Sequence, residues 1–278
     1  MKHFLESIQR RIDLYKEYVK LEELIIGKTS REAYSNYDYK VNRVLEEVFL
    51  DWRHRGNYTS LDEVRDQLKF GFDFDGSGYL CLDRMTIDME DYFLYCEMVL
   101  NLLVDLGGAL DDYLDAKYVK HVIETMDFTI SEFGYTRKSI DDEIKIIEKN
   151  AVAFQVADEN PEIEDIIVGY NHYLLRGNID EKRKILKSIA DALEPKRNEL
   201  ESISKKYTSD FFYLVNNMNI RHNNKTFDDK HYNEKYAKMN ENQIENVYDM
   251  AYEQALLLFQ LLSQPIRDAK IMELKAEI

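Results

Sequence analysis

The stretch DMEDYFLYCEMVLNLLVDL, residues 88–106, is the part of the sequence that decides the fold class. Its apolar side chains are Tyr92, Phe93, Tyr95, Cys96, Met98, Val99, Leu102, Leu103 and Leu106. They occupy most faces of a helix, and a helix that is apolar nearly all round is one that other elements cover. We therefore expect a central helix here, ended by Gly107 and Gly108, inside a larger helical body.

Helical periodicity continues on both sides of this stretch. Helices are expected over residues 2–26, 31–51 and 60–70 before it, and over 111–133, 161–176, 178–203 with a kink at Pro195, 209–219, and from 242 past 262 after it. Ser60 and Glu63 have the spacing of a capping box, and Asn178 and Glu181 have that of another N-terminal cap. With only 10 Gly and 3 Pro in 278 residues, long helices joined by few tight turns are the natural outcome.

One β signal stands out, in residues 143–157. Ile144, Ile146 and Ile147 precede Asn150, and Val152, Phe154 and Val156 follow it. This pattern predicts a hairpin that turns at Asn150 and is too small to be a domain. The expected fold is therefore mainly α, a multi-helix bundle with one small β-hairpin insert. We expect an N-terminal helical region over 1–80 and a helical domain over 85–278.

Charge and cysteine content narrow the function classes. The net charge of −16 disfavours non-specific binding to nucleic acid or to an anionic membrane, so no DNA partner is expected. Cys81 and Cys96 form no CxxC motif, which fits a reducing cytoplasm. The N-terminus lacks a signal-peptide apolar region, and the apolar run 255–262 is too short to span a bilayer. We expect a soluble cytoplasmic protein with no membrane partner.

Cofactor and metal motifs are weak. No GxxxxGK[ST], GxGxxG or GxSxG sequence occurs, and no cofactor is expected. Asp73 and Asp75 begin an EF-hand-like loop, but position 12 is Arg84, a cation where a bidentate Glu is needed, so calcium is a distant alternative. Two HxxE pairs occur, beginning at His121 and His231, and a metal site needs more ligands than one pair supplies. No metal is expected.

The strongest candidate site is NNMNIRHNNK, residues 216–225. If the preceding helix continues to residue 222, Met218 and His222 are four residues apart, and so are Asn217 and Arg221. A His that exchanges protons beside an Arg that stabilises anionic charge suits cleavage of an RNA phosphodiester, in which the 2′-hydroxyl is the nucleophile. The alternative is a helix C-terminus capped by Asn, with Arg221 and His222 near the negative end of the helix dipole.

The C-terminal two thirds of the chain resembles a known family. The segments that carry the resemblance are YNHYLLRGN (170–178), KRKIL (182–186), LEP (193–195) and NNMNIRHNN (216–224). They are similar to the C-terminal region of AbiJ-like abortive-infection proteins, bacterial phage-defence proteins of the HEPN superfamily. The resemblance covers roughly residues 85–265.

The resemblance implies a HEPN-like helical body that forms a homodimer with a composite site at the dimer interface. Active members are metal-independent endoribonucleases with an Arg, often a polar residue, a spacer of four to six residues and then His. Asn217 and His222 match the polar and His positions, whereas Asn216 stands where Arg is expected. Arg221 is then the cation beside His222. Asn216, Asn217, Arg221 and His222 are therefore the expected catalytic residues.

Two functions are compatible with the sequence alone. In the first, the chain is a phage-defence endoribonuclease in which His222 is the general acid or base and Arg221 stabilises the phosphate. In the second, it is a catalytically inactive helical module for dimerisation or protein interaction. Asn216 supports the second reading, because an amide cannot neutralise the charge of a phosphorane.

Overall fold

The computed structural model describes residues 12–26, 45–46, 48–52, 55–61, 63–64, 72–74, 80–82, 87–105, 116–140 and 143–276. It is mainly helical, which confirms the predicted fold class. The chain divides into two compact units, Met1–Ile146 and Ile147–Ile278. The predicted regions were 1–80 and 85–278, and residues 83 and 84 of the segment between them lie outside the described residues.

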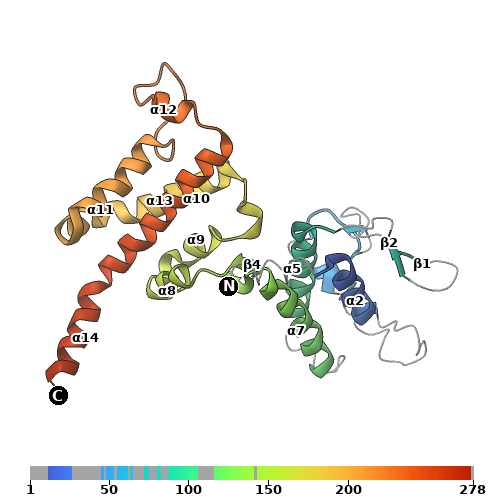
Figure 1. Ribbon diagram of the computed structural model, residues 1–278. Helices are drawn as coiled ribbons and strands as arrows, with labels where there is room; N and C mark the ends of the chain where they lie inside the picture. The colour runs from blue at the N-terminus through green and yellow to red at the C-terminus, as the bar shows by residue number, and fades with distance from the viewer. Residues whose placement is uncertain are drawn as a thin grey trace. The chain divides into compact units, whose positions relative to one another are not determined.

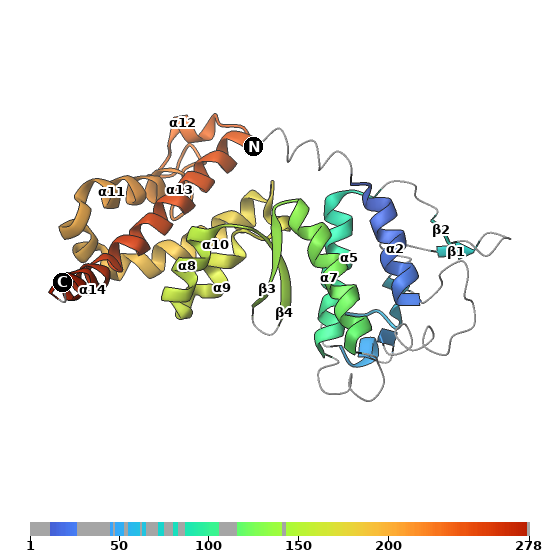
Figure 2. The ribbon, with the colours of Figure 1, turned by 60° about the horizontal axis from the view of Figure 1, so that its bottom comes forward.

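In the first unit, three helices lie side by side: α2 (Leu14–Ile26), α5 (Met89–Asp105) and α7 (Ala116–Glu132) (Figure 2). α5 contacts both others, as its apolar faces predicted, and Tyr92, Phe93 and Tyr95 on it are fully buried. The Tyr95 ring meets Tyr18 of α2 edge to face at 4.7 Å. The predicted helix 31–51 is described, and is helical, only at residues 45–46 and 48–51.

Two short hairpins belong to the described structure. β1 (Phe72–Phe74) pairs antiparallel with β2 (Leu80–Leu82), in a segment where no strand was expected. The proposed calcium ligands Asp75 and Ser77, together with Arg84, lie outside the described residues. β3 (Tyr135–Ile140) begins after a turn at Gly134, where φ is +85°, and pairs with β4 (Glu143–Glu148).

The prediction of a hairpin over 143–157 is correct for its first strand and wrong for its second. Its first half is β4, but the partner strand precedes it, and its second half is helix α8 (Ala151–Glu159). Asn150 is the N-cap of that helix, and its side chain accepts a hydrogen bond from the Ala153 N–H at 3.0 Å. An Asn suits a cap as well as a turn, and the alternation of Val152 and Phe154 alone did not separate the two.

The second unit is a helical body around α13 (Glu241–Leu262), which packs against α10 (Ile179–Leu193) and α11 (Arg197–Asn217) (Figure 1). The remaining helices are η2 (Pro161–Ile163), α9 (Glu164–Gly169), η3 (Tyr173–Leu175), η4 (Glu194–Lys196), α12 (Glu234–Ala237) and α14 (Gln264–Ala276). The helix predicted over 161–176 is thus three short ones. Asn178 caps α10 by accepting from the Glu181 N–H at 3.2 Å, as predicted.

A buried cation fixes α10 to α13. The Lys182 side chain is 8% exposed, and its ammonium donates to Glu245 and Asp249 of α13, each at 2.7 Å. The Tyr170 hydroxyl also donates to Asp249, at 2.8 Å. These contacts set the position of α10 relative to the start of α13. Across the described parts of the chain, no helix combines the length and the apolar character that crossing a membrane requires.

Candidate functional site

The helix that carries the candidate stretch ends earlier than expected. α11 stops at Asn217, Met218 is its C-cap, and Asn219 has the left-handed φ of +59°. The predicted pairs Met218/His222 and Asn217/Arg221 on one continuous helix are therefore wrong. Asn tolerates this backbone conformation better than most residues, and a left-handed residue just after the last turn ends a helix. The structure has a helix end at this place, as in the alternative, but the C-cap is Met218 and the left-handed Asn219 follows it.

The asparagines of this stretch hold the chain that follows α11 in a fixed loop. Asn224 is 1% exposed, and its side chain accepts from the Asn219 N–H at 2.7 Å and donates to the His231 carbonyl at 2.5 Å. Its N–H donates to the Asn219 side chain at 3.1 Å. Asn233 donates from its side chain to the Asn217 carbonyl, at 3.0 Å. A buried amide with its hydrogen bonds made specifies one loop conformation.

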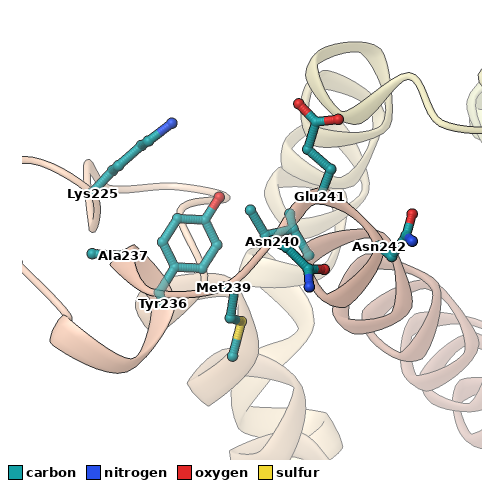
Figure 3. Close-up of a pocket in the computed structure, with 8 residues that line it drawn as sticks. Lys225, Tyr236, Ala237, Met239, Asn240, Glu241 and Asn242 are labelled. Carbon is teal, nitrogen blue, oxygen red and sulfur yellow. The ribbon is translucent and has the colours of Figure 1, made fainter.

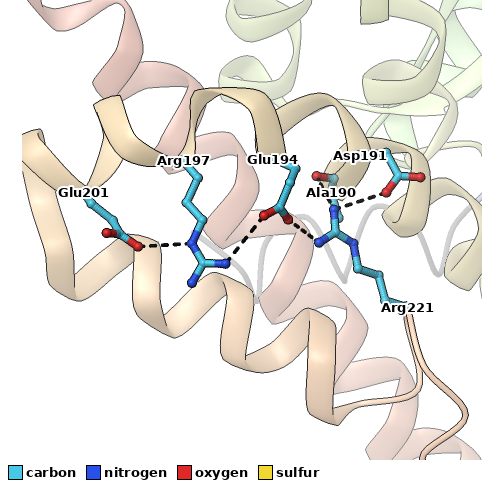
Figure 4. A network of polar contacts seen from close by, with 6 residues as sticks. All are labelled: Ala190, Asp191, Glu194, Arg197, Glu201 and Arg221. Carbon is cyan, nitrogen blue, oxygen red and sulfur yellow. Dashed lines mark hydrogen bonds and ion pairs between the residues drawn. The ribbon is translucent and has the colours of Figure 1, made fainter.

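The Arg221 guanidinium contacts carboxylates, and the side chain is only 18% exposed (Figure 4). Its guanidinium donates to Glu194, to Asp191 at 3.1 Å and to the Ala190 carbonyl at 3.0 Å. The hydrogen bond from Arg221 is the main cause that lowers the pKa of the Glu194 carboxyl. In this arrangement Arg221 ties the loop to the end of α10, and a phosphate would have to replace these partners to reach it.

His222 instead lies against a second histidine. The rings of His222 and His231 stack at 4.0 Å between centroids, with 10° between their planes, and both side chains are half-buried. Burial lowers the pKa of His222, and the neighbouring His231 and Arg221 lower it further, because a second positive charge nearby is unfavourable. A His that stays neutral near pH 7 can accept a proton.

We expect the imidazole of His222 to titrate below 6.5, its ordinary value. Since the folded pKa lies below the unfolded one, the folded state loses stability as pH falls through the interval between them, and none is lost above 6.5. Proton NMR of the histidine resonances, assigned with a His222→Gln variant, measures the midpoint. A His222 midpoint at or above 6.5 would contradict the stacked arrangement.

The structure brings together only part of the predicted site. Asn216 and Asn217 sit half-buried on the last turn of α11, where the Asn217 side chain donates to the Tyr213 carbonyl at 2.9 Å, within its own helix. Arg221 turns toward α10. His222 pairs with His231, which the sequence indicated only as one half of an HxxE pair. No periodicity relates two histidines across a loop, so this partner was missed.

The α11–α13 connection, residues 218–240, carries more basic than acidic side chains. It holds five basic residues, Arg221, Lys225, Lys230, Lys235 and Lys238, against three acidic ones, Asp228, Asp229 and Glu234. Its formal charge is therefore +2, in a chain of net charge −16, and +1 without Arg221, which is paired with Asp191 and Glu194 outside the connection. Phe227 is 78% exposed and lies edge to face with Tyr232 at 5.2 Å. Exposed aromatic and basic side chains together suit single-stranded nucleic acid.

Within the described ranges, no three His, Cys, Asp or Glu side chains gather in a way that could hold a metal ion. Comparison of the chain with protein-family models, with curated proteins and with solved structures found no match.

Proposed function

We propose that this chain is a HEPN-like phage-defence protein of the abortive-infection type, acting in the cytoplasm as a homodimer, that binds single-stranded RNA and cleaves it without a metal. The observation that carries the proposal is the stacked pair of His222 and His231 on the α11–α13 connection. This connection is positively charged and bears an exposed aromatic side chain, although the whole chain is strongly acidic. The segments that resemble abortive-infection proteins include the same histidine.

The proposed chemistry needs only the RNA and the two imidazoles. Neutral His222 takes the proton of a ribose 2′-hydroxyl, and the oxygen forms a bond to the adjacent phosphorus. The bond from phosphorus to the 5′-oxygen breaks, and protonated His231 supplies the proton that this oxygen takes up. The products are a 2′,3′-cyclic phosphate and a 5′-hydroxyl. Asn216 and Asn217, at the helix end, would donate hydrogen bonds to the substrate.

RNA binding is tested at Phe227. Replacement by Ala removes an exposed aromatic face on which one base can stack, and such stacking contributes about 1–3 kcal/mol per base. We expect Phe227→Ala to weaken binding of a single-stranded oligonucleotide about tenfold in fluorescence anisotropy, since about 1.4 kcal/mol corresponds to a factor of ten. Tyr213→Ala is the matched control, because Tyr213 is also an exposed aromatic, 55% exposed, but lies on α11. An equal loss of oligonucleotide affinity in both variants would contradict the assignment of the α11–α13 connection as the RNA-binding surface.

A second candidate is the catalytically inactive interaction module. Two observations favour it: Arg221 is held by carboxylates, and α14 exposes large apolar side chains. On α14, Ile266 is 63%, Met272 66% and Leu274 61% exposed, and the helix buries none of its described residues. Exposed apolar surface of this kind is typical of an interface. A chain that forms dimers but leaves RNA intact would favour this candidate over the nuclease.

A further inference from the structure

Two pockets adjoin in the second unit, and the first is lined by cations. It has a volume of about 570 Å³ and lies where the start of α10 meets the start of α13 and the α11–α13 connection. We call it the basic pocket. Arg176, Arg183 and Lys225 line it, against the carboxylates of Asp180 and Glu241. The lining is therefore net positive, opposite in sign to the chain as a whole.

The inner wall of the basic pocket is held in place. The Arg183 Nε donates to the Asn219 carbonyl, and this hydrogen bond holds the guanidinium against the α11–α13 connection. Tyr236 and Tyr248 are 3% and 0% exposed, and their hydroxyls lie 3.3 Å apart. A guanidinium oriented in this way binds a phosphate through two hydrogen bonds with little loss of rotamer freedom.

The second pocket differs in chemistry. We call it the amide pocket; its volume is about 590 Å³, and it shares Lys225, Tyr236, Glu241 and Ile244 with the basic pocket. Its own lining adds the apolar Met239 and the carboxamides of Asn240 and Asn242. Figure 3 shows Lys225 and the Tyr236 hydroxyl on one side of this pocket and Glu241 and Asn242 on the other.

We propose that the two pockets form one groove that binds a nucleoside phosphate. The phosphate lies in the basic pocket between Arg176, Arg183 and Lys225. The base lies in the amide pocket, on Met239 and Ile244, with the Asn242 carboxamide at its edge. Glu241 lines both pockets, and its carboxylate accepts hydrogen bonds from the ribose hydroxyls between base and phosphate. Volumes in this range are typical of small-molecule sites.

The nucleoside phosphate has two sources: a free nucleotide or one residue of an RNA strand. Only the second source rests on the proposed RNA binding. Isothermal titration calorimetry of the full chain with adenosine 5′-monophosphate tests the first, and titration with a single-stranded RNA oligonucleotide tests the second. Adenosine and inorganic phosphate are the partial ligands, and we expect each to bind at least about tenfold more weakly than the monophosphate.

Charge variants locate the phosphate. Arg176 and Lys225 are exposed, so Arg176→Gln and Lys225→Gln should leave the fold intact. Each removes a charge-assisted hydrogen bond, and we expect about a tenfold loss of nucleotide affinity from each. Lys187→Gln is the matched control, since Lys187 is exposed on α10, lines neither pocket and carries the same charge.

Three results would overturn the groove: no binding of either the monophosphate or the oligonucleotide, equal affinity for inorganic phosphate and the monophosphate, or an equal loss in the Lys187→Gln control. Binding confined to the oligonucleotide, and lost in Lys225→Gln, assigns the groove to an RNA strand. Nucleotide binding without any RNA cleavage would support the proposed groove and contradict the proposed nuclease activity. RNA cleavage in which neither Arg176→Gln nor Lys225→Gln changes the affinity for the substrate would contradict the proposed groove and support the proposed nuclease activity.

Discussion

Replacement of Asn224 by Ala is expected to lower the free energy of unfolding of the second unit by about 2 kcal/mol, because two partly buried backbone groups lose their partners at the lower end of about 1–3 kcal/mol each. Those groups are the Asn219 N–H and the His231 carbonyl, which the Asn224 side chain bonds at 2.7 and 2.5 Å. Urea denaturation followed by far-UV circular dichroism measures the change.

The matched control is Asn246→Ala on α13, where Asn246 is exposed. We expect it to change the stability by less than about 0.5 kcal/mol, as substitutions on open surface do. A loss in Asn224→Ala no larger than that in the control would mean that the asparagine network does not hold the loop. Asn224→Ala should also reduce RNA cleavage, because His231 loses the bond that places its backbone.

Replacement of His222 by Ala is expected to lower the rate of RNA cleavage by about 10²- to 10⁴-fold, the contribution that a positioned proton-transferring side chain makes. His231→Ala should cost a similar factor. The double variant should be little slower than either single one, because the two rings act in one step. Single-turnover cleavage of a fluorescent oligonucleotide in EDTA measures all three rates.

His121→Ala is the control for this series, since His121 is an exposed histidine of α7 in the other unit. It should cleave at the wild-type rate. Loss of activity in His121→Ala, or full activity in His222→Ala, would remove the stacked pair from the mechanism. Because all three histidines are partly or fully exposed, the variants should fold, and thermal denaturation checks this.

The sequence predicted the helices well wherever apolar periodicity was sustained. α5, α7, α10 and α13 lie where the pattern placed them, because each buries a broad apolar face and the pattern records that burial directly. β3 was missed, since its sequence YTRKSI is mostly polar and only its end residues, Tyr135 and Ile140, are buried. Strand pairing depends on a partner that local periodicity does not identify.

Composition singled out the candidate stretch, but its geometry was not predicted. An Asn-rich stretch after an apolar helix did mark the region, and His222 does lie in a setting that tunes its pKa. The direction of Arg221 was not predictable, because Asp191 and Glu194, its partners, are some 30 residues earlier on another helix. The pairing of His222 with His231 depends on the loop conformation that Asn224 holds. That conformation results from tertiary contacts, which local sequence patterns do not record.

Analysis of the ends that the wild-type chain leaves on single-stranded RNA in EDTA shows directly whether the stacked histidines cleave RNA. We expect cleavage that gives 2′,3′-cyclic phosphate and 5′-hydroxyl ends and that is absent when the ribose 2′-hydroxyl at the cleavage position is replaced by hydrogen. Intact RNA under these conditions, or cleavage that persists without the 2′-hydroxyl, would contradict this expectation.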